Sequence, residues 1–237
     1  MLRPVRVFLL LLVSVFACGQ PQGQAVADSP AGENVNKAPE PVTPIVTFTL
    51  DFPASQPEHY SIRVPGEGPA HYQSTGRISR DSDETDSFDF DFALSAAVRE
   101  KIFRLSASAK YFRGDLDSHQ KNLAFTGKKT LSYKDQRETG EATFNYSSNP
   151  AARELTEVFQ NLSATLEFGR RLDYELRYQK LALFDELKLM QQMAEDKQLI
   201  EVGAIQPILE QIVADQSVIN VARGRAQQLL QAGRALD

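Results

Sequence analysis

The stretch from Leu155 to Ala194 constrains the fold most, because it contains no proline and a single glycine, Gly169. Apolar side chains recur through it at steps of three and four residues, which places them on one face of an α-helix. We therefore predict one long helix with a buried stripe, unless Gly169 breaks it into two. The stripe consists of Leu162, Leu166, Leu172, Leu176, Leu183, Leu187, Met190 and Ala194.

The chain before residue 148 alternates apolar and polar side chains, the pattern of strands with one buried face. The predicted strands cover residues 46–52, 60–64, 72–78, 88–94, 123–133 and 142–146.

Capping residues mark where the predicted helices begin. Ser95 is a candidate N-cap for a helix that runs to Phe112, and Asn149 with Pro150 would open the long helix. Amphipathic segments near residues 205–212 and 218–230 predict two more helices, giving four in all.

Strands followed by helices predict an α+β fold: an antiparallel sheet of about six strands with one packed helix, then a long helix and a helical C-terminal part. We expect a sheet-plus-helix part over residues 45–148 and a helical part over 149–237, packed together as one domain. The 237 residues are 42% hydrophobic, which suffices for such a core.

The N-terminal segment has the pattern of a signal peptide. Arg3 and Arg6 precede an apolar run over residues 7–17 that is shorter than the roughly 20 residues a membrane helix needs. We therefore interpret residues 1–17 as a signal peptide and expect an exported protein.

The residues Val15-Phe-Ala-Cys18 resemble a bacterial lipobox, although Phe16 is bulkier than the residue that pattern prefers. The resemblance to bacterial lipoproteins implies cleavage before Cys18 and attachment of lipid to its sulfur. It therefore implies an anchor in the membrane, with the folded part facing the periplasm or the exterior. Cleavage after Ala27, which would release a soluble periplasmic or secreted protein, remains an alternative.

Residues 18–44 are predicted to be a lipidated cysteine and a disordered tether. Prolines, glutamines and glycines dominate the segment and aromatic residues are absent, so it cannot bury enough apolar area to offset its ordering entropy.

Composition argues against several classes of site. The 26 basic and 31 acidic residues do not favour nucleic acid as a partner, and a single cysteine cannot build a thiolate metal cage. No spacing of His, Asp or Glu fits a metal centre, and no cofactor motif is present. The acidic residues between Asp81 and Asp91 are interpreted as the wet face of a strand, with Lys128, Lys129 and Lys134 as cross-strand partners.

Charged residues in the middle of the long helix are interpreted as exposed ion pairs. Glu167 with Arg171 and Asp173 with Arg177 have the i,i+4 spacing that supports such pairs. The functional hypothesis for this region is a binding groove between the helix and the sheet, because arginine and tyrosine are frequent in binding sites. Its candidate residues are Arg170, Tyr174, Arg177 and Tyr178.

No motif supplies a nucleophile with its base, so no catalytic residue is assigned. We expect a non-catalytic binding or scaffolding protein of the cell envelope, with an envelope protein or a glycan as partner. Two alternatives remain: a subunit of a larger envelope assembly, or an exported enzyme whose site combines dispersed carboxylates such as Asp115, Asp117 and Glu175.

The targeting hypothesis predicts that the mature chain begins at a lipidated Cys18. Mass spectrometry of the N-terminal peptide tests it. A mature protein that begins with unmodified Asp28 would contradict the lipid anchor and leave export intact.

Overall fold

The computed structural model describes residues 43–77 and 84–234. Cys18, the predicted signal peptide and most of the predicted tether lie outside the described residues. So do Ile78, at the end of the third predicted strand, and Asp81 and Asp83 of the acidic run.

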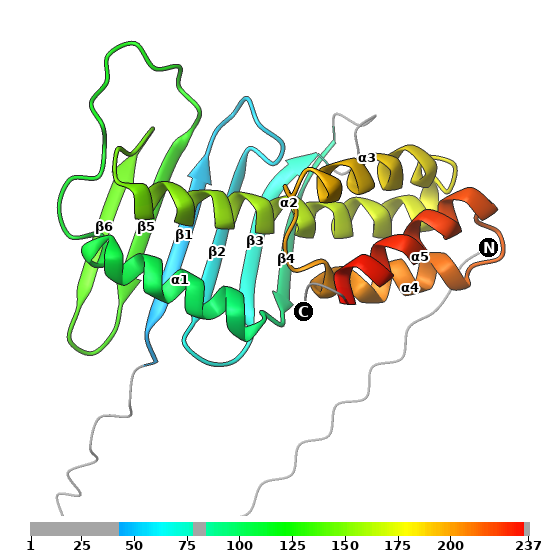
Figure 1. Ribbon diagram of the computed structural model, residues 1–237. Coiled ribbons are helices and arrows are strands. Elements are labelled where there is room, and N and C mark those ends of the chain that lie inside the picture. Colours follow the sequence, from blue (N-terminus) through cyan, green and yellow to red (C-terminus); the bar gives the residue numbers. More distant parts are fainter. Residues whose placement is uncertain (1–42, 78–83, 235–237) are drawn as a thin grey trace, which may run out of the picture. The chain divides into compact units, whose positions relative to one another are not determined.

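Six strands form one antiparallel sheet in the order β4-β3-β2-β1-β5-β6 (Figure 1). The α+β prediction is confirmed. The strands are β1 (Ile45–Asp51), β2 (His59–Pro65), β3 (Ala70–Arg77), β4 (Thr85–Phe92), β5 (Lys128–Lys134) and β6 (Thr139–Phe144).

Alternate side chains of the strands point to a single core, as their period-2 pattern predicts. Val46, Phe48 and Leu50 of β1 are buried, while Thr47 and Thr49 between them lie on the open face. The same alternation continues in β2, β3 and β5. The sheet is therefore apolar on one face and polar on the other.

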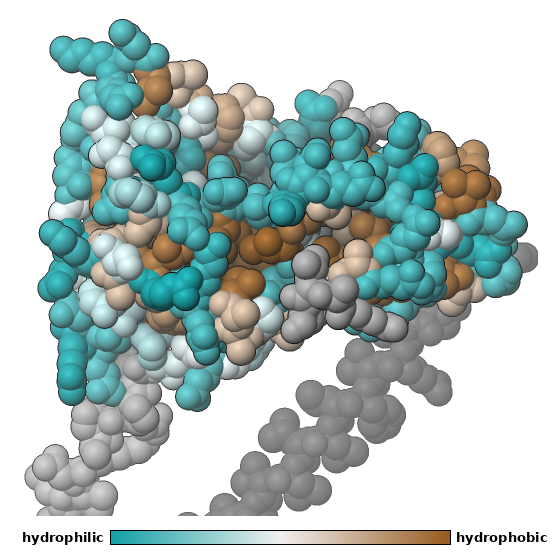
Figure 2. All heavy atoms as spheres, viewed as in Figure 1, coloured by the Kyte–Doolittle hydropathy of each residue, from teal (hydrophilic) through white to brown (hydrophobic). Residues whose placement is uncertain are grey.

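Two helices lie across the apolar face, α1 (Ala96–Ser108) and the first half of α2 (Pro150–Tyr178) (Figure 1). Both predicted caps are confirmed. The Ser95 hydroxyl accepts a hydrogen bond from the Val98 amide, and the Asn149 side chain caps the first turn of α2. Figure 2 shows a band of apolar side chains between these two helices. A short 3₁₀ helix, η1 (Lys110–Phe112), follows α1.

The prediction of one unbroken helix from 155 to 194 is wrong. Gly169 lies inside α2, and the break falls instead between Tyr178 and Leu183, where α3 (Leu183–Glu195) turns back alongside α2 (Figure 1). In this turn, Nζ of Lys180 donates a hydrogen bond to Oδ2 of Asp215 at 2.6 Å. A stripe of period 3.6 is satisfied equally by one helix or by two antiparallel ones, so the pattern could not reveal the turn.

Three further elements complete the C-terminal part: η2 (Val202–Ile205), α4 (Gln206–Ala214) and α5 (Asn220–Arg234). The described residues thus contain five α-helices, not the predicted four. Gly169 is needed because η2 approaches α2 closely there. A Cβ atom at this position would lie 2.5 Å from Cγ2 of Ile205.

The fifth predicted strand begins later than expected. Residues 123–127 form a loop in which Leu123 and Phe125 are 42% and 59% exposed, and β5 starts at Lys128. Gly127 has a φ of 100°, a conformation that interrupts a strand and that glycine adopts without strain.

The predicted pairing of the β5 lysines with the acidic strand is also wrong, because β1, β2 and β3 separate β5 from β4. Lys129 is buried and donates to the carbonyl oxygens of Thr126 and Asn145. Burial lowers its pKa.

Within the part of the chain that the structure describes, no helix has both the length and the apolar character that crossing a membrane requires.

The stacked rings of Phe159 on α2 and Phe48 on β1, 5.2 Å apart and nearly parallel, join the helix layer to the sheet. Replacing Phe159 with alanine is expected to lower the free energy of unfolding by about 3–5 kcal/mol, because it leaves a cavity in the core. Urea denaturation of the purified protein measures the change.

The matched control is Phe125→Ala, which removes an exposed ring that touches Phe52 edge-on. It is expected to cost less than about 1 kcal/mol. Equal losses for the two variants would show that the Phe159 ring does not join the layers.

Candidate functional site

The four predicted groove residues, Arg170, Tyr174, Arg177 and Tyr178, line one cavity of about 490 Å³. We call this cavity the β4 groove. Three elements bound it: β4 from Asp86 to Phe90, the second half of α2, and the segment of η2 and α4 from Ala204 to Gln211. The structure therefore brings the four residues together, and their role in binding stays a prediction.

The floor of the β4 groove is apolar. Phe88 and Phe90 of β4 stack with ring centroids 5.8 Å apart, and both rings are only partly buried. Ile205 and Ile208 face them from the C-terminal part, and Leu166 lies on α2. Apolar side chains that remain partly exposed in a concave site are available to bind a ligand.

The rim of the groove combines aromatic and charged side chains. Tyr174 and Tyr178 lie with ring centroids 5.1 Å apart, and Tyr178 is 70% exposed. The predicted pair of Arg177 with Asp173 is confirmed, with a guanidinium nitrogen 2.8 Å from the carboxylate. This rim therefore offers two phenol rings and a partly neutralised cation.

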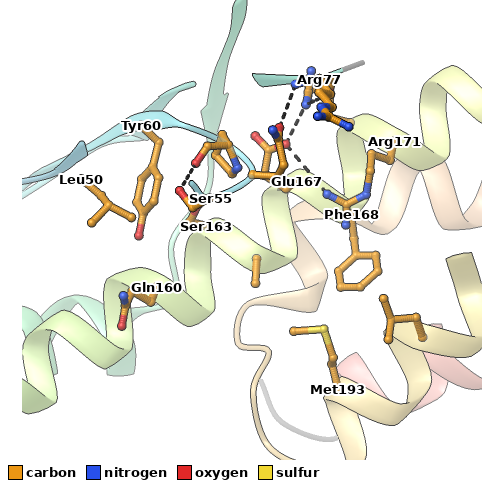
Figure 3. Close-up of a pocket in the computed structure, with 15 residues that line it drawn as sticks. Leu50, Ser55, Tyr60, Arg77, Gln160, Ser163, Glu167, Phe168, Arg171 and Met193 are labelled. Carbon is orange, nitrogen blue, oxygen red and sulfur yellow. Dashed lines mark hydrogen bonds and ion pairs between the residues drawn. The ribbon is translucent and has the colours of Figure 1, made fainter. Parts of the chain in front are cut away.

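Arg170 lines both this groove and a second cavity of similar size. Figure 3 shows that second cavity, which is bounded by α2, α3 and the loop between β1 and β2. Nε of Arg170 donates to Glu167 at 3.0 Å, and its guanidinium also donates to the carbonyl oxygen of Arg77 at the end of β3. Arg170 is therefore held in place by the protein itself and contributes mainly to the shape of the groove.

The interpretation of Glu167 as an exposed partner of Arg171 is wrong. Glu167 is 2% exposed, and its Oε1 accepts hydrogen bonds from Tyr72 at 2.9 Å and Ser74 at 2.6 Å. The predicted pairing with Arg171 is present, with a separation of 4.0 Å, but it is buried, and Arg171 makes a closer contact by donating to Glu186 at 2.6 Å. The carboxylate thus lies between α2 and β3, where it joins two layers.

The phenols near this carboxylate remain neutral donors. Burial, followed by the negative charge of Glu167, raises the pKa of Tyr72 well above its ordinary value. Burial likewise raises the pKa of Tyr60, which lines the second cavity (Figure 3). The Tyr72 hydroxyl also lies 2.9 Å from that of Ser163 on α2. These side chains form hydrogen bonds with one another, and we therefore interpret them as a network that stabilises the fold.

The dispersed carboxylates of the enzyme alternative do not all come together: Asp115 and Asp117 both contact His119, whereas Glu175 lies apart from them. Asp117 accepts a hydrogen bond from the amide of Asn145, next to β6 at one edge of the sheet. Glu175 is buried farther along α2 than Arg170. Because Arg170 contacts the end of β3, this part of α2 lies near the opposite edge of the sheet. Asp115 lies 2.5 Å from Nε2 of His119, and this contact raises the pKa of the imidazole and lowers that of the carboxyl.

Part of the acidic run, Asp89 and Asp91, lies on the wet face of a strand as predicted. Asp89 and Asp91 lie on the open face of β4, where the imidazole nitrogens of His71 approach them at 3.4 and 2.8 Å. Asp86 lies on the other face, at the rim of the β4 groove. Among the described residues, no group of three or more His, Cys, Asp and Glu side chains is arranged to hold a metal ion.

Several groove residues were missed by sequence reasoning. Phe88 and Phe90 were predicted to be ordinary core residues of a strand, and nothing local to Ile205 or Ile208 indicates that they approach β4. A signal for the Glu167 network did exist, because Ser74 shares the inward parity of Tyr72. An inward serine needs a partner, and the partner is Glu167.

Comparisons with protein-family models, with curated proteins and with solved structures found no match for this chain.

Glu167→Gln is expected to lower the free energy of unfolding by about 3 kcal/mol, because it removes a buried charge opposite Arg170 and places an amide donor there. Chemical denaturation of the purified protein measures the loss. The matched control is Asp173→Asn, which removes an exposed carboxylate from the same helix and is expected to cost at most about 0.5 kcal/mol. A Glu167→Gln variant as stable as the control would show that the network contributes little.

Proposed function

We propose that the protein is an exported, lipid-anchored protein of the cell envelope that acts by binding a partner in the β4 groove. The observation that carries the proposal is the groove itself, with its partly exposed phenylalanine floor and its rim of tyrosine and arginine. Aromatic rings with polar tips and arginines are the groups that dominate binding energy in protein interfaces.

The groove is large enough to hold a part of a partner molecule. Its volume of about 490 Å³ lies in the usual range for binding sites, roughly 300–1,000 Å³. The Phe88 and Phe90 rings can cover an apolar side chain or the apolar face of a sugar, while Arg177 and the tyrosine hydroxyls supply hydrogen bonds. An envelope protein or a glycan fits this chemistry.

The N-terminal sequence supports the location in this proposal. Lipid on Cys18 would hold the protein at the membrane, and residues 18–44 would act as a flexible tether. A coil of this length has a reach of roughly 28 Å, which would allow the groove to meet partners away from the lipid surface.

Participation in a larger envelope assembly is the second candidate function. It has support from three strongly exposed apolar residues in the C-terminal part: Leu181 (79% exposed), Ile219 (43%) and Val221 (56%). Exposed apolar groups of this kind can be covered by another subunit.

Site-specific photo-cross-linking tests the binding function. Replacing Tyr178 with the photoreactive residue p-benzoylphenylalanine in the full-length protein, followed by irradiation of intact cells, is expected to give a discrete adduct. The groove rim exposes this side chain, and benzophenone reacts with C–H bonds of proteins and glycans alike. Mass spectrometry of the adduct identifies the partner.

The control position is Arg137, an exposed residue in the turn between β5 and β6. A second control combines the probe at Tyr178 with Tyr174→Ala, which removes the neighbouring ring and is expected to reduce the adduct severalfold. Equal adduct yields at Tyr178 and Arg137, unchanged by Tyr174→Ala, would contradict binding in the groove.

A further inference from the structure

Strand β4 is an edge of the sheet. Within residues 43–77 and 84–234, it pairs with β3 alone, and it is the terminal strand in the sheet order. An edge strand presents a row of backbone N–H and C=O groups with which another extended chain can pair. Its eight residues, Thr85–Phe92, are long enough for such a ladder.

Helix α2 continues beyond this edge. Its 29 residues extend over about 43 Å, whereas six strands spaced by about 4.8 Å occupy about 24 Å. The helix crosses the strands and runs on past β4 (Figure 1). Ser163 and Glu167 face β3, and Tyr174 and Arg177, farther along, line the β4 groove. The groove therefore lies beside β4 and below α2, where one more strand would add to the sheet.

The two faces of β4 set different requirements for that strand. Phe88 and Phe90 point to the groove side, so residues of an added strand on this side would be apolar. Asp89 and Asp91 are exposed on the open side, where a single imidazole, His71, faces both carboxylates. Residues of an added strand on this side would meet a surplus of negative charge, which lysine or arginine would neutralise.

The same charges argue against a second copy of this chain as the occupant. Antiparallel pairing of β4 with β4 of another molecule would place the Asp89 and Asp91 carboxylates of the two strands next to one another. Like charges opposite each other on neighbouring strands are destabilising. Charge complementarity therefore favours a basic partner over self-association.

We propose that the β4 groove binds an extended peptide with alternating apolar and basic residues, which pairs with β4 as a seventh strand. Its apolar side chains lie in the groove against Phe88 and Phe90, and its basic side chains lie beside Asp89 and Asp91. This inference rests on the proposed function, because it specifies the partner class of the same groove. Main-chain pairing supplies affinity in this recognition mode, and the alternate side chains supply specificity.

The test uses a fluorescent synthetic peptide of sequence Lys-Val-Lys-Phe-Lys-Val-Lys and the full-length protein, with affinity measured by fluorescence anisotropy. Two control peptides isolate the contributions: one has glutamate in place of lysine, and one has alternate backbone amides methylated. Both are expected to bind at least about tenfold more weakly, because the first is repelled and the second cannot pair with the strand. Hydrogen exchange at the β4 amides is expected to slow when the lysine peptide is bound.

Charge-reversal variants locate the peptide. Asp91→Lys is expected to weaken binding of the lysine peptide about tenfold. Glu141→Lys is the matched control, because Glu141 is exposed on the same face and belongs to the same cross-strand row at the opposite edge of the sheet. It is expected to change the affinity less than twofold. Circular dichroism checks that both variants are folded.

Three outcomes would overturn the inference. Equal affinity for the lysine and glutamate peptides would exclude the charge argument, and equal affinity for the methylated peptide would exclude strand pairing. A dimer in sedimentation experiments that Asp91→Lys alters and Glu141→Lys does not would show that a second copy occupies the edge. In each case a cross-link from Tyr178 to another molecule would leave the proposed function standing. If no such cross-link forms, both the proposed function and the strand-pairing inference are contradicted.

Discussion

The buried carboxylate of Glu167 determines how the helix layer sits on the sheet. It accepts hydrogen bonds from two side chains of β3 and from Arg170 of its own helix, so α2 can take one rotation and one position along its axis. A slip by one residue would leave a charge without donors in the core, which is far more costly than a rearranged apolar contact. Because the same helix carries Tyr174 and Arg177, this constraint also fixes the position of the rim of the β4 groove.

Much of the fold followed from local patterns. The parity of Val46 and Phe48 indicated which face of β1 is buried, and Ser95 and Asn149 marked the starts of α1 and α2 because a side-chain cap is a local interaction. The order of the strands depends on contacts between residues that are distant in the sequence. In the observed order, Lys129 lies far from the acidic strand with which it was expected to pair. The turn after Tyr178 was not predicted either, because the stripe of apolar side chains keeps its helical spacing through the turn.

The candidate site was predictable in part. Arg170, Tyr174, Arg177 and Tyr178 share one side of one helix, so their spacing alone brought them together. The opposite walls of the groove come from β4 and from the segment after Val202, and only the tertiary structure shows that these segments meet. The helical spacing thus predicts one wall of the site, but not the two walls that make it concave.

The close approach at Gly169 has a consequence for the dimensions of the site. Gly169 and Ile205 both line the β4 groove, and they nearly touch because the glycine has no side chain. A methyl group at this position would push η2 and the start of α4 away from α2, and the far wall of the groove would move with them. The separation of the walls, and with it the thickness of any molecule that can enter, is therefore set by the absence of one carbon atom.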